Sequence, residues 1–139
     1  MSNGEIDRKI AVIFVADVVG YSKLMAKDEV RTLDNLKKRR DFIDAIIEEY
    51  EGRIFNTAGD SVLAEFSSPV RAVECSVQIQ NRSQAINNAS EDTDKMSFRI
   101  GINVGDVMIS EVNLFGDAVN IAARLEAQAL TDGICISQS

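Results

Sequence analysis

The sequence of 139 residues contains no histidine and no tryptophan, and it has only one proline and two cysteines. Without histidine, the commonest general base of enzymes is missing, and so are the Ser-His and Cys-His pairs that activate nucleophiles. Cys75 and Cys135 lie in apolar segments without the spacing of metal ligands, so we interpret both as small core residues. Chemistry in this chain must therefore depend on carboxylates, amides, arginines and bound metal ions.

The chain also lacks an excess of positive charge and a long apolar run. Its 15 Lys and Arg residues against 22 Asp and Glu residues give a formal net charge of −7, which argues against binding to nucleic acid or to an anionic membrane. No apolar stretch approaches the ~20 residues of a membrane-spanning helix, and residues 1–7 form a polar tail without a signal-peptide pattern. We therefore expect one cytoplasmic globular domain with no direct membrane insertion.

Hydrophobic periodicity predicts an alternation of strands and helices. The nearly unbroken apolar run at 8–18 is typical of a central strand that is covered on both faces. Helical spacing and capping residues predict helices over 28–50, 68–85 and 117–129. Further strands are expected over 53–57, 61–66, 96–104, 107–110 and 134–137, with a turn at Gly105 and Asp106.

The order β-α-β-β-α-β, followed by β-α-β, predicts an α+β fold with a ferredoxin-like antiparallel sheet and helices packed on one face. In that topology the first strand lies beside the third and runs antiparallel to it. The end of the first strand and the turn between the second and third strands then share one edge of the sheet.

Two aspartates occupy these two places. Asp17 follows the first apolar run, and Asp60 lies in the tight turn between the second and third strands. Two converging carboxylates form a site for a divalent cation. The alternative is structural, because Asp before a helix is a common cap and Gly-Asp is an ordinary turn dipeptide.

Other residues point to phosphate and sugar. Gly20 lies at a strand-to-helix corner, where backbone N–H groups can approach phosphate oxygens. Asn120 and Arg124 are four positions apart on a predicted helix and share a face, so an amide and a guanidinium together could orient a sugar and neutralise a phosphate. A solvated helix face would explain the same two residues.

Four segments, taken together, resemble the catalytic domain of class III adenylate and guanylate cyclases. They are Ala16–Ser22, Thr57–Phe66, Gly101–Gly105 and Phe115–Arg124, in the order and spacing of that family. The resemblance covers 8–139, but the family's domain normally continues further, so we expect its C-terminal part to be missing here. Diguanylate cyclases share the sheet topology, but their Gly-Gly-Asp/Glu-Glu-Phe signature is absent from the sequence.

The resemblance implies an enzyme that converts ATP or GTP to the 3′,5′-cyclic nucleotide and pyrophosphate. Asp17 and Asp60 match the family's ligands for two divalent cations, Mg²⁺ or Mn²⁺. Asn120 matches the residue that orients the ribose, and Arg124 matches the residue that neutralises charge on the α-phosphate. The implied phosphate-binding loop consists of Val18, Val19, Gly20, Tyr21 and Ser22. The family's sites form between two head-to-tail subunits, so the resemblance implies a homodimer.

The sequence departs from the family at the two positions that select the base. The adenine-selecting Lys is replaced by Asn56, and its usual Asp or Thr partner is replaced by Asn113. An amide can donate and accept, so either purine edge fits, but the charge of a Lys contact is lost. The alternative function is therefore a cyclase-like regulatory or dimerisation module that binds nucleotide with weak or no turnover.

Overall fold

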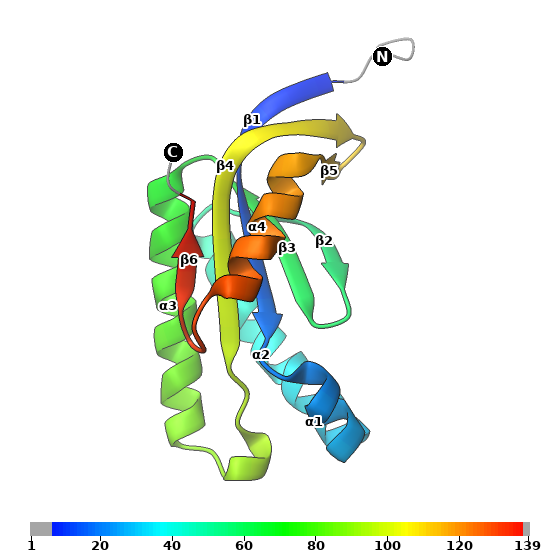
Figure 1. The fold of residues 1–139 in the computed structure, drawn as a ribbon. Helices are drawn as coiled ribbons and strands as arrows, with labels where there is room; N and C mark the ends of the chain where they lie inside the picture. The colour runs from blue at the N-terminus through cyan, green and yellow to red at the C-terminus, as the bar shows by residue number, and fades with distance from the viewer. Residues whose placement is uncertain (1–6, 138–139) are drawn as a thin grey trace.

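The computed structural model describes residues 7–137, which form a sheet of six strands with helices on both faces (Figure 1). The strand order is β2-β3-β1-β4-β5, and β6 pairs in parallel with β4. The strands are β1 (Asp7–Val18), β2 (Arg53–Ala58), β3 (Ser61–Phe66), β4 (Phe98–Ser110), β5 (Asn113–Phe115) and β6 (Ile134–Ile136). The helices are α1 (Tyr21–Lys27), α2 (Glu29–Glu49), α3 (Pro69–Asn88) and α4 (Asp117–Gln128), with a short 3-10 helix, η1 (Asp92–Asp94). Within the described residues, no helix combines the length and apolarity that crossing a membrane demands.

Strand β1 is the centre of the sheet, as its apolar run predicts. It is antiparallel to β3, with Ala16 opposite Val62, and antiparallel to β4 along its whole length. The predicted α+β antiparallel sheet and the predicted pairing of the first and third strands are thus confirmed. The predicted tail 1–7 lies outside the described residues except for Asp7, which begins β1.

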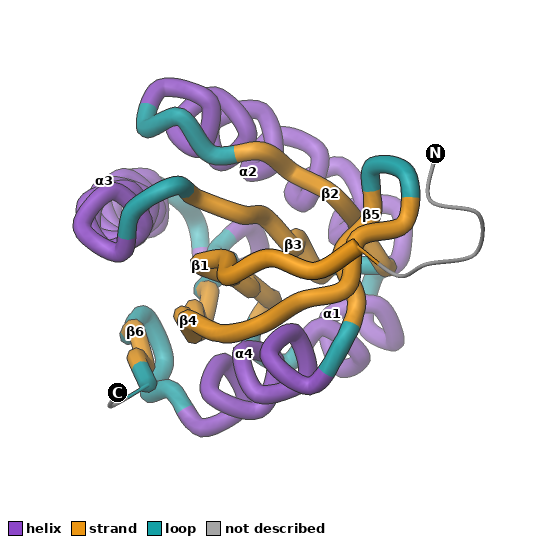
Figure 2. The backbone as a smooth tube through the Cα atoms, turned by 90° about the horizontal axis from the view of Figure 1, so that it is seen from above, coloured by secondary structure: helices purple, strands orange, loops and turns teal. Residues whose placement is uncertain are grey.

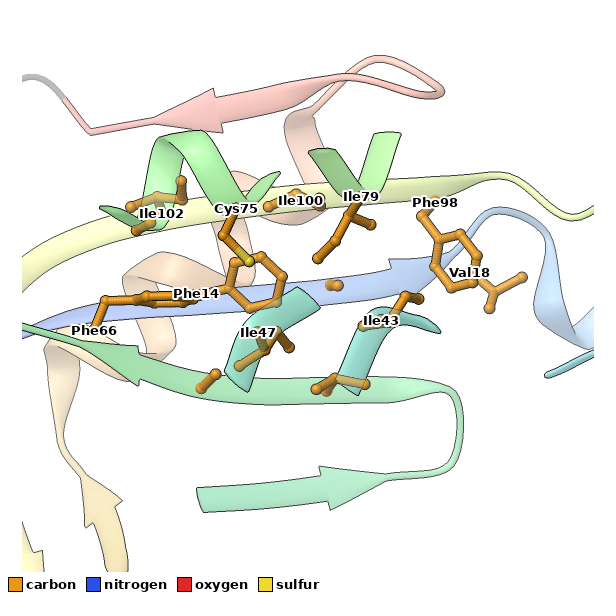
Figure 3. Close-up of a cluster of buried hydrophobic side chains, with 14 of the residues drawn as sticks. Phe14, Val18, Ile43, Ile47, Phe66, Cys75, Ile79, Phe98, Ile100 and Ile102 are labelled. Carbon is orange, nitrogen blue, oxygen red and sulfur yellow. The ribbon is translucent and has the colours of Figure 1, made fainter. Parts of the chain in front are cut away.

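Helices cover both faces of the sheet, so the prediction that they pack on one face is wrong. Alternate residues of β1, including Phe14, point into a core formed with α2 and α3, and Figure 3 shows this cluster. Phe14 packs edge-to-face on Phe66, with 5.8 Å between the ring centroids. The other buried residues of β1, including Ile13, pack in a second cluster with α4. This helix covers the opposite side of the sheet (Figure 2). The physical reason is that every residue from 11 to 16 is buried, and a strand that is apolar on both faces needs cover on both.

The turn predicted at Gly105 and Asp106 is also wrong, because β4 continues through it to Ser110. Gly105 lies opposite Ala11 of β1, so the ladder between the two long strands is unbroken there. A Cβ at this glycine would lie 3.0 Å from the Cβ of Ala118, so the glycine makes room for α4 and does not form a turn. The chain reverses later, and the return strand is the short β5.

Helices α2 and α3 begin at side-chain caps. Asp28 accepts a hydrogen bond from Arg31 N at 3.0 Å at the start of α2, and the Ser68 hydroxyl accepts from Val70 N at 3.1 Å at the start of α3. The α3 helix extends to Asn88, three residues beyond the predicted end. The seven-residue helix α1, which directly follows the corner at Gly20, is absent from the sequence-based prediction.

Candidate functional site

The fold brings Asp17 and Asp60 together at one edge of the sheet, as the topology predicts. Asp17 is the penultimate residue of β1, and Asp60 is the second residue of the β2–β3 turn, after Gly59 with a φ of +58°. Both carboxylates accept a hydrogen bond from the backbone N–H of Val18, Asp17 Oδ1 at 2.8 Å and Asp60 Oδ2 at 3.1 Å. Because the two carboxylates share one donor, most of their lone pairs remain available to a cation.

This donor set fits the divalent cations that the family uses. Carboxylate oxygens are the ligands that Mg²⁺ and Mn²⁺ prefer. Across residues 7–137 no group of three or more His, Cys, Asp or Glu side chains is placed to hold a metal ion, so the protein offers a pair of carboxylates rather than a closed cage. Mg²⁺ is commonly bound in this way, with the remaining positions taken by water and by substrate phosphates.

The corner after β1 presents free backbone donors. Val18 N is used by the two carboxylates, and Val19 N donates to the carbonyl of Ser97 at 2.9 Å. No acceptor within the described part of the chain engages the N–H groups of Gly20, Tyr21 and Ser22. Gly20 has a φ of +66°, a conformation that glycine adopts without strain. The predicted phosphate loop thus has three available donors, the first of them three residues after Asp17.

Asn120 and Arg124 lie on the outer side of α4. The helix turns Ala118, Ala122 and Glu126 toward the sheet, and all three are buried. Asn120 and Arg124 fall on the opposite side, where both are exposed, so they do not join the carboxylates of their own chain. Arg124 Nη2 lies 3.7 Å from Asp117 Oδ1, but both side chains are largely exposed and such a pair holds the guanidinium weakly.

The two positions that are predicted to select the base lie on β2 and β5, which contact each other although they are at opposite ends of the strand order. Arg53 Nη1 of β2 donates to the carbonyl of Val112, next to β5, at 2.6 Å. Asn56 is exposed on β2. Asn113 begins β5, where its Oδ1 accepts a hydrogen bond from Leu114 N at 3.0 Å. This bond does not use the NH₂ group of Asn113.

Three residues of β4 fix α4 to the sheet, a role that the sequence-based prediction did not assign to them. Asn103 Nδ2 donates to the carbonyl of Ala118 at 3.0 Å. Gly101 allows the helix backbone to approach so closely that a Cβ would overlap Ala122 O and Glu126 N. Arg99 Nε lies 3.5 Å from Glu126 Oε2. Arg99, Gly101 and Asn103 alternate with apolar residues along the strand, and this period of two is the signal that could have identified the face that packs against α4.

The Arg99–Glu126 pair lies beside the carboxylates, with Glu126 buried and Arg99 half-buried. Burial raises the pKa of Glu126, the guanidinium of Arg99 opposes this rise, and the negative charge of Asp60 adds to it. The side chain of Glu126 therefore lies within electrostatic range of Asp60, although it is not part of any metal-ligand cluster in residues 7–137.

Comparison with known proteins finds adenylate cyclases of similar sequence. The chain is 41% identical over 138 residues to putative adenylate cyclase 3 of Rhizobium meliloti, covering 99% of the chain and 24% of that protein. It is 29% identical over 132 residues to an adenylate cyclase of Streptomyces coelicolor, covering 94% of the chain and 33% of that protein. The chain thus spans a quarter to a third of the length of these relatives.

Solved structures show the same fold. An adenylate/guanylate cyclase/hydrolase from Silicibacter pomeroyi superposes with a TM-score of 0.88 at 38% identity, over 96% of this chain and 78% of that one. A bacterial light-regulated adenylyl cyclase superposes with a TM-score of 0.81 at 27% identity, over 91% of this chain and 41% of that one. The sequence model of the family named adenylate and guanylate cyclase catalytic domain matches residues 4–139, and the chain belongs to this family.

Proposed function

We propose that this chain forms the catalytic domain of a nucleotide cyclase that converts ATP or GTP to the 3′,5′-cyclic nucleotide and pyrophosphate. The observation that carries the proposal is the convergence of Asp17 and Asp60 on the backbone N–H group of Val18, two residues before the first of three unused backbone donors. In this reaction the ribose 3′-oxygen attacks the α-phosphorus, and the bond to the bridging oxygen of the leaving pyrophosphate breaks.

Each group of the chain has a defined task. Asp17 and Asp60 would hold two divalent cations, Mg²⁺ or Mn²⁺, which when bound neutralise triphosphate charge and favour ionisation of the 3′-hydroxyl. The N–H groups of Gly20, Tyr21 and Ser22 would donate to phosphate oxygens; Val18 and Val19, predicted as part of the same loop, supply its backbone but not free N–H groups.

Asn120 and Arg124 would act on the nucleotide held by a second copy of the chain. Both side chains are exposed on the outer side of α4 and are available to a partner. The amide of Asn120 would orient the ribose, and the guanidinium of Arg124 would neutralise charge that develops on the α-phosphate. A head-to-tail homodimer would pair the carboxylates of one subunit with α4 of the other, so that a single chain is inactive.

A second function is favoured by Asn56 and Asn113. Neither residue brings a charge to the base, so a cyclase-like module that binds nucleotide and dimerises without efficient turnover is the alternative. Asn113 keeps an NH₂ group to donate and Asn56 is exposed, so both can still hydrogen-bond a purine edge.

The test is an assay of the purified dimer with ATP or GTP and Mn²⁺, with the product identified chromatographically. We expect a cyclic nucleotide from the wild type and none from Asp17→Ala. Product formation at the same rate in both proteins would overturn the enzymatic function. Nucleotide binding without any product in the wild type would support the regulatory module instead.

A further inference from the structure

The Arg99–Glu126 pair has no task in the proposed reaction, yet it is built into the protein next to the carboxylate site. Glu126 is only 5% exposed. Arg99 Nε and Glu126 Oε2 are 3.5 Å apart, and both atoms are buried without a hydrogen-bond partner in the described residues. Glu126 is a buried carboxylate whose half-buried partner Arg99 is held close without a hydrogen bond, an arrangement worth explaining because charged groups are costly to bury.

Arg99 has a second carboxylate within reach. It lies directly opposite Asp17 in the antiparallel ladder of β1 and β4. Residues in this relation point to the same face of the sheet with Cβ atoms about 4.5–5.5 Å apart, a separation that an arginine side chain can span. Among the ion pairs of residues 7–137, however, Arg99 is paired with Glu126 and not with Asp17 or Asp60.

Glu126 is a neighbour of the site and not one of its ligands. The charge of Asp60 contributes to the raised pKa of Glu126, so the two carboxylates are close enough to interact electrostatically. No third carboxylate joins Asp17 and Asp60 as a metal-binding cluster in the described part of the chain. Besides this direct repulsion, Glu126 can act on the site through its ion-pair partner Arg99.

We propose that Glu126 is a positioning residue of the metal site: its carboxylate holds the Arg99 guanidinium against α4 and so keeps Asp17 and Asp60 free for divalent cations. Without this partner, the guanidinium would turn to the nearest carboxylates and compete with the metal ion for them. The proposal rests on the proposed function, because it assumes that the two aspartates bind a metal ion.

The test measures the binding of Mn²⁺ to the full chain in the absence of nucleotide. Electron paramagnetic resonance of the free ion reports how much Mn²⁺ remains unbound. Glu126→Gln should weaken Mn²⁺ binding on the order of 10-fold, the size of effect that partners of metal ligands commonly have. The decisive variant is Glu126→Gln combined with Arg99→Gln, which removes the competing cation and should restore binding to near the wild-type value. Arg99→Gln alone should not weaken binding.

Each result separates the possibilities. Unchanged Mn²⁺ binding in Glu126→Gln, or a double variant that stays as weak as Glu126→Gln, overturns the positioning role. The second of these results would show that Glu126 acts by general structural support, which thermal unfolding of the three variants would reveal independently. Binding that Asp17→Asn does not weaken overturns the metal site itself, and with it this proposal.

Discussion

Asp17 and Asp60 accept hydrogen bonds from the same backbone N–H group, that of Val18, at 2.8 and 3.1 Å. Their two carboxylates are thereby fixed at one point of the sheet edge, although they come from a strand end and a hairpin turn. Two like charges held this close repel each other, and a divalent cation relieves this repulsion.

Stabilisation by Mn²⁺ should depend on this pair. A ligand at 100 times its dissociation constant stabilises the folded state by about 2.7 kcal/mol, which corresponds to a rise of roughly 10 °C in the unfolding temperature of a domain of this size. Asp60→Asn keeps an oxygen that can accept from Val18 N but removes one charge. We expect this variant to unfold close to the wild-type temperature without Mn²⁺ and to lose the Mn²⁺-dependent rise, as measured by differential scanning calorimetry. A full rise in the variant would contradict the assignment of Asp60.

The carboxylate pair could be predicted from the sequence because it depends only on strand order. Once β1 and β3 are neighbours and antiparallel, Asp17 and the β2–β3 turn must share an edge, whatever the details of packing. The cover that α4 gives to the second face could have been derived as well. Residues 11–16 are apolar at both odd and even positions, so both faces of the strand require cover.

The Arg99–Glu126 pair could not be predicted in the same way. The two residues belong to different elements, and their contact depends on how closely α4 approaches β4, which the missing side chain of Gly101 allows. The failed turn at Gly105 has the same origin, because a glycine that a helix requires for close approach has the same sequence signature as a glycine that a turn requires. Local patterns predict elements, whereas such contacts depend on the packing between them.

Complementation should reveal the composite site. Asp17→Asn lacks a metal ligand, and Arg124→Ala lacks the guanidinium on α4, so each homodimer should be inactive. When equal amounts are mixed and allowed to exchange, half of the dimers combine one subunit of each kind and contain one intact site out of two. The mixture should therefore recover about one quarter of the wild-type cyclase activity. No recovery, in a mixture whose subunit exchange is verified by mass spectrometry, would contradict a site shared between subunits.

Gly101→Ala should lift α4 from the sheet. The new methyl group would overlap the backbone of Ala122 and Glu126, which cannot move aside as a flexible side chain can. We expect destabilisation of about 3 kcal/mol in urea unfolding, at the upper end of the usual cost of overpacking. Gly105→Ala is the matched control, because its Cβ would meet the Cβ of Ala118 at 3.0 Å and requires only a small shift. Equal losses in the two variants would contradict the close approach at Gly101.

Glu65 should make folding stability depend on pH in the acidic range. Burial acts to raise the pKa of Glu65, but the hydrogen bonds and charges of Lys9 and Arg53 outweigh it, so the pKa lies below its ordinary value of 4.5. Because the folded state holds this carboxylate ionised, its contribution to the free energy of unfolding is complete above the pKa of the unfolded chain, near 4.5. It is lost as the pH falls through the lower pKa of the folded state.

Glu65→Gln should therefore lower the free energy of unfolding at pH 7 by roughly 1–2 kcal/mol, between the values for exposed and buried pairs. Urea unfolding between pH 7 and pH 3 should show this difference from the wild type shrinking below about pH 4.5. The exposed Glu48, which forms no ion pair in residues 7–137, provides the control, and Glu48→Gln should change the free energy of unfolding at pH 7 by less than about 0.5 kcal/mol. A difference between wild type and Glu65→Gln that persists undiminished at pH 3 would show that the side chain stabilises the fold by packing and not by its charge.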